Sequence, residues 1–525
     1  TFRILNREKN LAEFKEGLKF FDFGSQNWSY ADIEGNIAYF TSGELPLRED
    51  LQGGFIADSI PPFFIRDGTG ASAHQWVALK GPKPSDQATP FEILPFEEMP
   101  QTVNPKNGFI VNANNDPIGT SLDNNAFNSR RPGGGIYYLS PGYDFGFRAQ
   151  RITELIQQKL KSGDPIRLSE IDKIQADVVS LEARRLMPFL LAAIDAARAS
   201  DAPRELAQFL QDPRMLEAQA YLNNWSFNTP TGLFEGFDEP DAATQDTLAL
   251  LDPSEAEIRD SVATTIFNVW RSQLVKNTID ATLDRLAKLS GVPLSGPARR
   301  LGTREAVTAL ITLLERFPAT KGHGISGLNF FEVPGSDAAP TVKRDLIILQ
   351  SLKEALDLLA SDAYAKSFNK STNLKDYRWG KLHRIIFSHI LGAPFSTPTD
   401  PRILAQLRIP ANMIDREVYA RGVPTDGGLG IVDNSGYPAR AEQGDDSFVF
   451  TSGPAQRLVA TVGLRGGSGL KITARNVVPG GASGIRGDRH FGDLLPLWLA
   501  NDFHPVFFER DEIERNAESL QNFVP

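Results

Sequence analysis

The sequence predicts an α+β fold, and three features of its order along the chain indicate this class. Short apolar stretches between Gly- and Pro-rich segments, which are typical of strands, occupy the first 146 residues and return from about residue 376. Stretches with helical spacing dominate the region between them. No internal repeat is present, and strands do not alternate with helices as in βαβ folds. We therefore expect strand-rich segments at 1–146 and 376–525 on either side of a mainly helical segment at 147–375.

The first segment contains a helix and a hairpin signal. Residues 5–20 have helical spacing, and Asn10 with Glu13 three positions later resembles a capping box. Residues 27–40 alternate around Gly35-Asn36, which predicts a β-hairpin. Residues 41–107 and 126–146 are rich in Pro and Gly, so we expect long loops there.

The clearest helical signal lies in the middle segment. Apolar residues recur at near-helical spacing from Ser169 to about Ala199. Ser169 is a favourable N-cap residue, and Pro188 inside the run predicts a kink. Further on, "RLVATVGL" at 457–464 is typical of a strand.

Composition excludes several classes of function. A net charge of −10 argues against nucleic acid as the main partner, because phosphate binding requires a basic surface. No apolar run approaches the ~20 residues of a membrane span. The chain has no cysteine, which excludes disulfides, a cysteine nucleophile and Cys-based metal sites.

The common catalytic motifs are also absent. The sequence has no G-x-S-x-G elbow, no H-E-x-x-H and no Walker A loop. Six histidines are present, but none belongs to a recognisable catalytic pattern. If the protein is a hydrolase, its general base is not a histidine of a known motif.

The stretch "NGFIVNANNDPIG" at 107–119 is the most informative one. An apolar run stops at Asn112, and two adjacent amides follow at Asn114 and Asn115. Asparagine favours turns and caps them with its side chain. Its carboxamide N–H₂ is also a donor that can stabilise an oxyanion. The residues alone leave both interpretations open.

Eight phrases, in order along nearly the whole chain, resemble the β subunit of the penicillin acylase family. They are "NWSYADIEGNIAYFTSGELPLR", "PPFFIRDGTG", "ILPFEEMPQTVNPKNGFIVNANNDPIG", "GFRAQRITEL", "SVATTIFNVW", "YRWGKLHRIIFSHILG", "FVFTSGPAQRLV" and "VVPGGASGIRGDRHFGDLLPLWL". The family consists of N-terminal-nucleophile amide hydrolases, including penicillin acylases and acyl-homoserine-lactone acylases. The resemblance implies a four-layered αββα fold with a large helical insertion, to whose core the C-terminal segment returns.

The same resemblance implies roles for three side chains. The first Asn of "ANN" corresponds to Asn114 and is expected to form the oxyanion hole. The Arg that opens "RITEL" corresponds to Arg151, expected to hydrogen-bond near the nucleophile's amine and to hold Asn114. Gln26 lies on the strand expected to flank the acyl pocket. A turn cap and a surface charge are the structural alternatives for Asn114 and Arg151.

The family's nucleophile is the first residue of the β subunit, usually serine, whose own α-amine acts as the base. Residue 1 of this sequence is threonine. The stretch "TFRILNREKNLAEF", however, resembles a part that lies well inside the family's β subunit. We therefore expect that Thr1 is not the nucleophile and that the attacking serine belongs to a separate N-terminal segment.

Some family members hold a structural Ca²⁺ ion between their two subunits. The resemblance places the Pro62 carbonyl and Asp123 near this ion, with Asp116 as the second choice for the acid. Oxygen ligands of this kind suit calcium, and a solvated Asp/Asn loop is the alternative. His383 and Arg457 belong to matching phrases and are expected to be structural hydrogen-bonding residues.

These observations lead to one main hypothesis and one alternative. The chain is expected to be part of a bacterial acylase, periplasmic or secreted, that needs no organic cofactor. It would cleave an acyl group from a small amide such as a β-lactam, an acyl-homoserine lactone or a lipopeptide. Its partners would be an α subunit and an N-terminal β segment, all released by self-cleavage of one precursor. The alternative is a non-catalytic binding or scaffold protein that kept this fold and lost its nucleophile.

Overall fold

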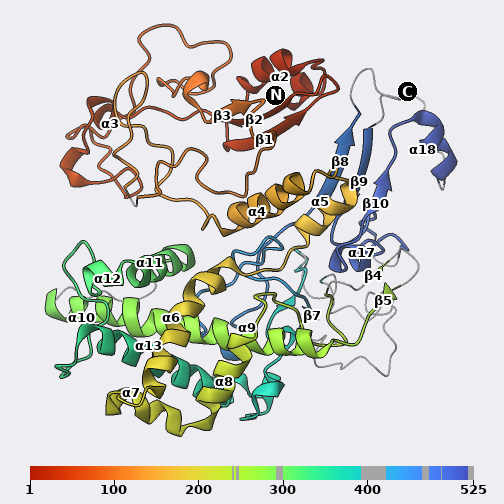
Figure 1. The fold of residues 1–525 in the computed structure, drawn as a ribbon. Coiled ribbons are helices and arrows are strands. Elements are labelled where there is room, and N and C mark those ends of the chain that lie inside the picture. The colour runs from red at the N-terminus through yellow and green to blue at the C-terminus, as the bar shows by residue number, and fades with distance from the viewer. Residues whose placement is uncertain are drawn as a thin grey trace. The chain divides into compact units, whose positions relative to one another are not determined.

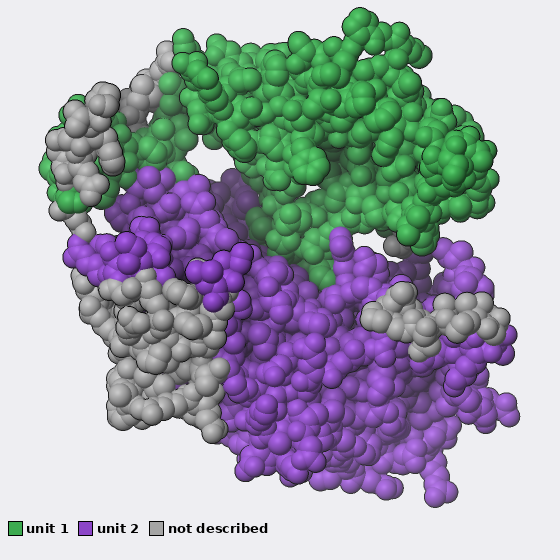
Figure 2. All heavy atoms as spheres, turned by 180° about the vertical axis from the view of Figure 1, so that it is seen from behind, with its two compact units in different colours: residues 1–153, 460–473, 507–525 green, residues 154–459, 474–506 purple. Residues whose placement is uncertain are grey.

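The computed structural model describes residues 1–123, 125–238, 242–243, 248–290, 300–388, 390–391, 396, 421–463, 472–485, 488–517 and 519. The chain divides into two compact units. Unit 1 contains residues 1–153, 460–473 and 507–525, and unit 2 contains residues 154–459 and 474–506 (Figure 2). Each unit joins stretches that are distant from one another in the chain.

Unit 1 begins with two short helices and a three-stranded sheet. The helices are α1 (Phe2–Leu5) and α2 (Leu11–Leu18), and the strands are β1 (Gln26–Ala31), β2 (Ile37–Ser42) and β3 (Gln101–Val103) (Figure 1). The sheet is antiparallel with order β1-β2-β3. Leu18, Ala38 and Phe40 form its buried core.

Local signals set the borders of these elements. The Asn10 side chain accepts a hydrogen bond from the Glu13 backbone N–H at 3.0 Å and caps α2, as predicted. The predicted helix over 5–20 is nevertheless wrong at its start, because the chain leaves helical geometry between α1 and α2. The hairpin prediction is confirmed: β1 and β2 pair from Gln26↔Ser42 to Ala31↔Ile37, and Gly35 has a φ of +85° in the turn.

Long loops make up most of the rest of unit 1, as the sequence predicts. They are interrupted by α3 (Glu49–Gly53), by two short 3-10 turns (Ala57–Ser59 and Phe96–Glu98), and by the start of α4 (Phe147–Ser162). The loop of residues 57–66 is fixed by a buried ion pair in which Arg66 donates to both oxygens of Asp50, at 3.2 and 2.7 Å. Arg66 also donates to the Ile60 carbonyl.

Unit 2 is mainly helical and is built around α9. Its main helices are α5 (Leu168–Gln175), α6 (Leu181–Arg198), α7 (Arg204–Ala207), α8 (Pro213–Asn223), α9 (Glu255–Val275), α10 (Ala281–Ser290), α11 (Thr303–Glu315), α12 (Phe317–Thr320), α13 (Pro340–Leu359) and α14 (Ala365–Phe368). Every residue of α9 from Asp260 to Val275 is buried. Helices α8 and α13 pack against it, as Figure 1 shows. A π-helical turn, Lys276–Asp280, joins α9 to α10.

The single helix predicted from Ser169 to Ala199 is wrong, because two helices occupy this stretch. Arg167, not Ser169, precedes α5 as its cap residue, and Ser180 caps α6 by accepting from the Ala183 N–H at 3.1 Å. Between them, the Ser180 N–H donates to the Phe227 carbonyl at 2.8 Å. This contact with a distant segment holds residues 176–180 in a non-helical conformation. α6 continues through Pro188.

The C-terminal part adds short strands. The sheet of order β10-β9-β8 contains β8 (Arg457–Val462), β9 (Ile472–Val477) and β10 (His504–Val506), so the strand predicted from "RLVATVGL" is present. The pair β6 (Arg384–Ile385) and β7 (Val423–Pro424), the pair β4 (Ala242–Ala243) and β5 (Leu248–Ala249), and helices α17 (Leu495–Leu499) and α18 (Arg510–Asn516) complete the elements. No helix in the described ranges combines the length and the apolarity needed to cross a bilayer.

Candidate functional site

The two adjacent asparagines of the 107–119 loop have different surroundings. Asn115 is a turn cap: its Oδ1 accepts from the Ala113 N–H at 3.0 Å, and its Nδ2 donates to the Asp116 carbonyl at 3.1 Å. Both polar atoms of Asn115 are therefore used by the backbone of its own loop. Asn115 is therefore a turn cap, which is the structural alternative described above for an asparagine in this loop.

Asn114 has different hydrogen-bond partners from Asn115. Its side chain is exposed, and its backbone is left-handed, with a φ of +59°. Its Oδ1 accepts a hydrogen bond from Arg148 Nη2 at 2.9 Å, and its backbone carbonyl accepts from the Asp144 N–H at 2.9 Å. Within the described part of the chain, the Nδ2 group has no acceptor. The carboxamide is thus held by its oxygen while its donor remains available.

Arg148 is a site residue that sequence reasoning missed. It is the second residue of α4, and its Nε and Nη2 atoms donate to Asp144 Oδ2 at 2.9 and 2.7 Å. The only local signal was the spacing of Asp144 and Arg148, four residues apart at the start of a predicted helix. The contact with Asn114 spans 34 residues, and nothing in the local pattern announces it.

Arg151, the arginine predicted to hold Asn114, lies on α4 one turn after Arg148 and is half-buried. It interacts with other parts of the protein. The hydrogen bond to Asn114 comes from Arg148. The role of Arg151 near the nucleophile's amine remains a prediction.

A hydrogen-bond chain through the buried Tyr39 connects the Asn114 loop to the first sheet. Asn112 Nδ2 donates to the Tyr39 hydroxyl at 3.2 Å, and that hydroxyl donates to Asn27 Oδ1 at 2.6 Å. Burial raises the pKa of Tyr39 to about 12, so its hydroxyl is neutral over the physiological range. Burial likewise raises the pKa of Tyr143, with a further contribution from the charge of Asp116. The Tyr39 hydroxyl is therefore a neutral hydrogen-bonding group that supports this loop.

Gln26 lies at the first position of β1, opposite Ser42. Its side chain is exposed and donates to the Gly24 carbonyl at 3.1 Å. A cavity of about 230 Å³ opens beside the sheet, with Ser42, Leu94 and Phe96 in its wall. Gln26 is not among the lining residues, and its contact with an acyl group remains a prediction.

Thr1 lies at the N-cap position of α1, and its hydroxyl donates to the Phe20 carbonyl. That hydroxyl is therefore engaged in a hydrogen bond that stabilises the start of unit 1. The identity of the nucleophile remains a prediction.

The proposed calcium ligands do not form a complete site by themselves. The carboxylate of Asp123 accepts from the Asn125 N–H at 3.0 Å and from Asn128 Nδ2. Burial alone would raise the pKa of Asp116, but hydrogen bonds from Ser121 and from two further backbone N–H groups hold it below 3.8. No group of three or more Asp, Glu, His or Cys side chains suited to a metal occurs among the described residues. Since Ca²⁺ takes about 6–8 oxygen ligands, a site at Pro62 and Asp123 needs further ligands from elsewhere.

His383 and Arg457 are structural, as expected. His383 is fully buried, with Nδ1 2.7 Å from the Thr425 carbonyl and Nε2 2.5 Å from Ser435 Oγ. Burial lowers the pKa of His383 to about 4. Arg457 pairs with Asp433 at 3.1 Å. Neither side chain lines the cavities of about 660 and 230 Å³ described in this section.

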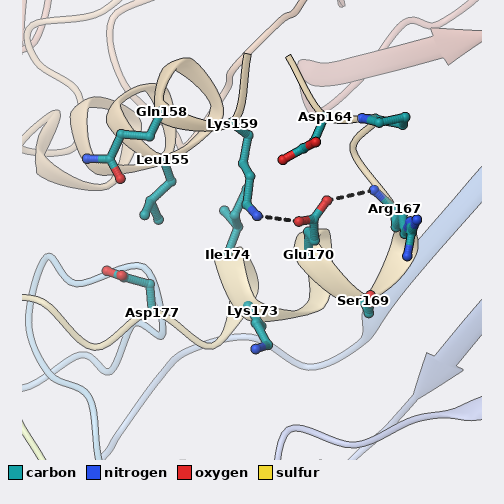
Figure 3. A pocket seen from close by; sticks show the side chains of 11 residues that line it. Leu155, Gln158, Lys159, Asp164, Arg167, Ser169, Glu170, Lys173, Ile174 and Asp177 are labelled. Atoms are coloured by element: carbon teal, nitrogen blue, oxygen red, sulfur yellow. Dashed lines mark hydrogen bonds and ion pairs between the residues drawn. The ribbon is translucent and has the colours of Figure 1, made fainter. Parts of the chain in front are cut away.

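Unit 2 contains a separate polar cavity of about 660 Å³ between the end of α4 and α5. Figure 3 shows the Glu170 carboxylate between Lys159 and the backbone N–H of Arg167. Lys173, Asp164 and Asp177 complete a lining of mixed charge. None of the predicted site residues lines this cavity, so the candidate site is the Asn114 cluster of unit 1, which consists of Asn114, Asp144 and Arg148.

Comparison with known proteins shows which family the chain belongs to. The sequence model of the penicillin amidase family matches residues 1–515. Penicillin G acylase of Escherichia coli is 30% identical over 190 residues, which are 35% of this chain and 17% of that protein. The chain therefore matches well under two thirds of the length of this relative.

The fold also resembles that of a solved penicillin G acylase. The solved structure of a thermostable penicillin G acylase from Alcaligenes faecalis superposes with a TM-score of 0.50 at 16% sequence identity, covering 99% of this chain and 71% of that one. This likeness confirms the predicted α+β, N-terminal-nucleophile hydrolase fold. Because the family match extends over almost all of the sequence, the chain belongs to the penicillin amidase family, a family of amide hydrolases.

Proposed function

We propose that this chain provides the oxyanion-binding part of an acylase that hydrolyses a linear amide. One observation carries the proposal: the Asn114 carboxamide is held through its oxygen while its N–H₂ group is exposed and available. In acyl transfer, negative charge develops on the carbonyl oxygen of the substrate. A fixed amide donor stabilises that charge, and losing one such donor costs about 10²–10³ in rate.

The proposed reaction follows from this geometry and from the family. A hydroxyl oxygen attacks the amide carbon, and its proton passes through the α-amine of the same residue to the leaving nitrogen. The C–N bond breaks, the amine departs, and an ester joins the acyl group to the nucleophile. Water then cleaves the ester, which releases the acid and restores the hydroxyl. Asn114 Nδ2 donates to the oxyanion in both steps.

The remaining parts of the machinery are proposed from the resemblance. The nucleophile is an N-terminal serine on a separate segment, and Arg151 hydrogen-bonds near its amine. An α subunit and this segment come from one precursor by self-cleavage. A structural Ca²⁺ ion uses the Pro62 carbonyl and Asp123 together with ligands outside the described residues. Export to the periplasm or beyond is proposed from the same resemblance.

The proposed substrate is a small acyl amide, either a β-lactam, an acyl-homoserine lactone or a lipopeptide. The Escherichia coli relative described above is named penicillin G acylase, which supports an acyl amide of the penicillin type. Gln26 is proposed to flank the acyl pocket. A polar side chain there does not indicate which acyl group is preferred.

The test compares the complete protein with its Asn114→Gly variant on phenylacetyl and decanoyl p-nitroanilides. Glycine accepts the left-handed backbone of residue 114, so the variant loses the carboxamide without adding strain. We expect kcat to fall by about 10²–10³. Asn115→Ala, which removes the turn cap, is the matched control and should lower stability more than kcat. Hydrolysis by the parent with an unchanged kcat in Asn114→Gly would remove Asn114 from the mechanism. Absence of hydrolysis by the parent on both probes would favour a binding protein.

A further inference from the structure

We infer that Arg148, fixed by Asp144, is the positioning residue that orients the Asn114 carboxamide toward the oxyanion. The inference rests on the proposed function and names a residue that the family resemblance does not. It starts from a closed ring of contacts in unit 1. Asp144 donates its N–H to the Asn114 carbonyl, Arg148 donates to the Asp144 carboxylate, and Arg148 also donates to Asn114 Oδ1.

The chemistry of arginine decides which way the amide points. A guanidinium has only donors, so the atom of Asn114 that faces it must be the acceptor, Oδ1. The Nδ2 group is then directed away from Arg148. A lysine or a hydroxyl in this place would give a less definite orientation, because an ammonium rotates freely and a hydroxyl can also accept.

Arg148 is itself well fixed. Two of its nitrogens, Nε and Nη2, donate to the same carboxylate oxygen of Asp144 at 2.9 and 2.7 Å. The side chains of Arg148 and Asp144 are only 17% and 23% exposed, which limits competition from water. Arg148 belongs to the first turn of α4, so its backbone is set by a helix of 16 residues. The pair therefore ties an exposed loop to a regular element.

Asn114 needs such a support because of its position. It is exposed and lies in a loop, where a free carboxamide exchanges between rotamers and hydrogen-bonds with water. Oxyanion stabilisation depends on donors that are already oriented before the reaction. The guanidinium charge beside Oδ1 also polarises the amide and strengthens its N–H donors. Asp144 balances this charge, so the cluster carries no net charge toward the substrate.

The test is a double-mutant cycle in the complete protein, with kcat and KM measured on phenylacetyl p-nitroanilide. The variants are Arg148→Met, Arg148→Lys, Asn114→Gly and the double variant Asn114→Gly/Arg148→Met. The matched control is Arg184→Met. It removes an arginine of α6 that pairs at 3.1 Å with Glu154, which lies on α4 like Arg148, and among the described residues it has no hydrogen bond to Asn114. Thermal unfolding of each variant reports whether the fold is intact.

We expect Arg148→Met to lower kcat about ten- to a hundredfold with KM changed less than about threefold, since orientation matters mainly in the transition state. Arg148→Lys keeps one donor and should recover part of this loss. In the Asn114→Gly background, Arg148→Met should change kcat by less than about twofold, because its effect acts through Asn114. Arg184→Met should leave kcat unchanged.

Two results would overturn the inference while leaving the proposed function intact. One is a kcat of Arg148→Met within about twofold of the parent while Asn114→Gly is strongly impaired. The other is an undiminished effect of Arg148→Met in the Asn114→Gly background. If the parent protein hydrolyses no probe, the proposed function itself fails. Should Arg148→Met unfold, Arg148→Lys and Asp144→Asn test the same ring with smaller changes.

Discussion

The Tyr39 hydroxyl accepts a hydrogen bond from the Asn112 carboxamide at 3.2 Å, across 73 residues of sequence. It also donates to Asn27 on the neighbouring strand. The buried phenol of Tyr39 therefore attaches the loop that presents Asn114 to the first sheet. This attachment leads to the first of five predictions.

Tyr39→Phe should destabilise unit 1 and disturb the site mildly. The change removes a hydrogen-bond partner from the half-buried Asn112 and from the exposed Asn27, and a lost hydrogen bond of this kind costs about 0.5–1.5 kcal/mol. We expect a lower urea midpoint and a loss in kcat of less than about tenfold. Tyr30→Phe is the control, because its hydroxyl bonds Asp32 and has no link to Asn112. Equal effects of the two substitutions on kcat would contradict the prediction.

Asp50→Asn should loosen the loop of residues 57–66. Asp50 is fully buried against Arg66, and breaking a buried pair on one side costs about 3–5 kcal/mol. Trypsin should then cut after Arg66 in the variant and not in the parent. Asp58→Asn, which alters a mostly exposed neighbour, should leave the trypsin pattern of the parent.

The same pair predicts a pH dependence. Burial alone would raise the pKa of Asp50, but the hydrogen bonds from Arg66 and from the backbone of Ala57 and Leu51 hold it below 3.8. A carboxyl with a lowered folded pKa contributes stability above the unfolded pKa and loses it as the pH falls through the folded value. Trypsin is inactive in this range, so pepsin should open the loop below about pH 3.8 in the parent. If pepsin cleaves the loop of the Asp50→Asn variant with the same pH dependence as in the parent, protonation of Asp50 is not the cause of that dependence.

His383 should destabilise unit 2 in mild acid. Its pKa is about 4 in the folded protein and 6.5 in an unfolded chain. The unfolded chain therefore binds more protons between these values, and stability should fall by about 3 kcal/mol from pH 6.5 to 4. His383→Gln, which keeps a donor for the Thr425 carbonyl, should flatten this slope in urea unfolding followed by tryptophan fluorescence. An unchanged slope would assign the effect to other groups.

The buried pair of Glu182 and Arg271 should be more costly to break than to replace. Arg271 Nη1 lies 3.0 and 3.2 Å from the two carboxylate oxygens, and both side chains are buried between α6 and α9. Glu182→Leu and Arg271→Met should each cost about 3–5 kcal/mol, and the double variant less than either one. Urea unfolding of the three variants measures this. If the double variant lost as much free energy of unfolding as the two single variants together, the prediction would be wrong.

Local signals explain what could be predicted about the fold. The Asn10 cap and the Gly35-Asn36 turn act within a few residues, so the sequence indicates them directly. The break before Ser180 could not be predicted, because its cause is a hydrogen bond to Phe227, 47 positions away. Isolated elements are thus predictable where their stabilising contacts are near in sequence.

The candidate site shows the same division. The "ANN" phrase singled out Asn114 through its resemblance, yet residue types alone did not separate it from Asn115. The structure separates them by their partners: backbone groups for Asn115 and a guanidinium for Asn114. Arg148 could not be predicted, because a side-chain contact between residues 34 positions apart produces no periodic pattern in the sequence.

The positive φ of Asn114 limits which amino acids evolution can place there. Glycine tolerates the backbone but brings no carboxamide, and aspartate tolerates it but would oppose an anion. Glutamine brings the carboxamide on a longer stem that suits this backbone poorly. Under the proposed chemistry, asparagine alone satisfies both demands, so homologues with another residue at this position should have abandoned amide cleavage.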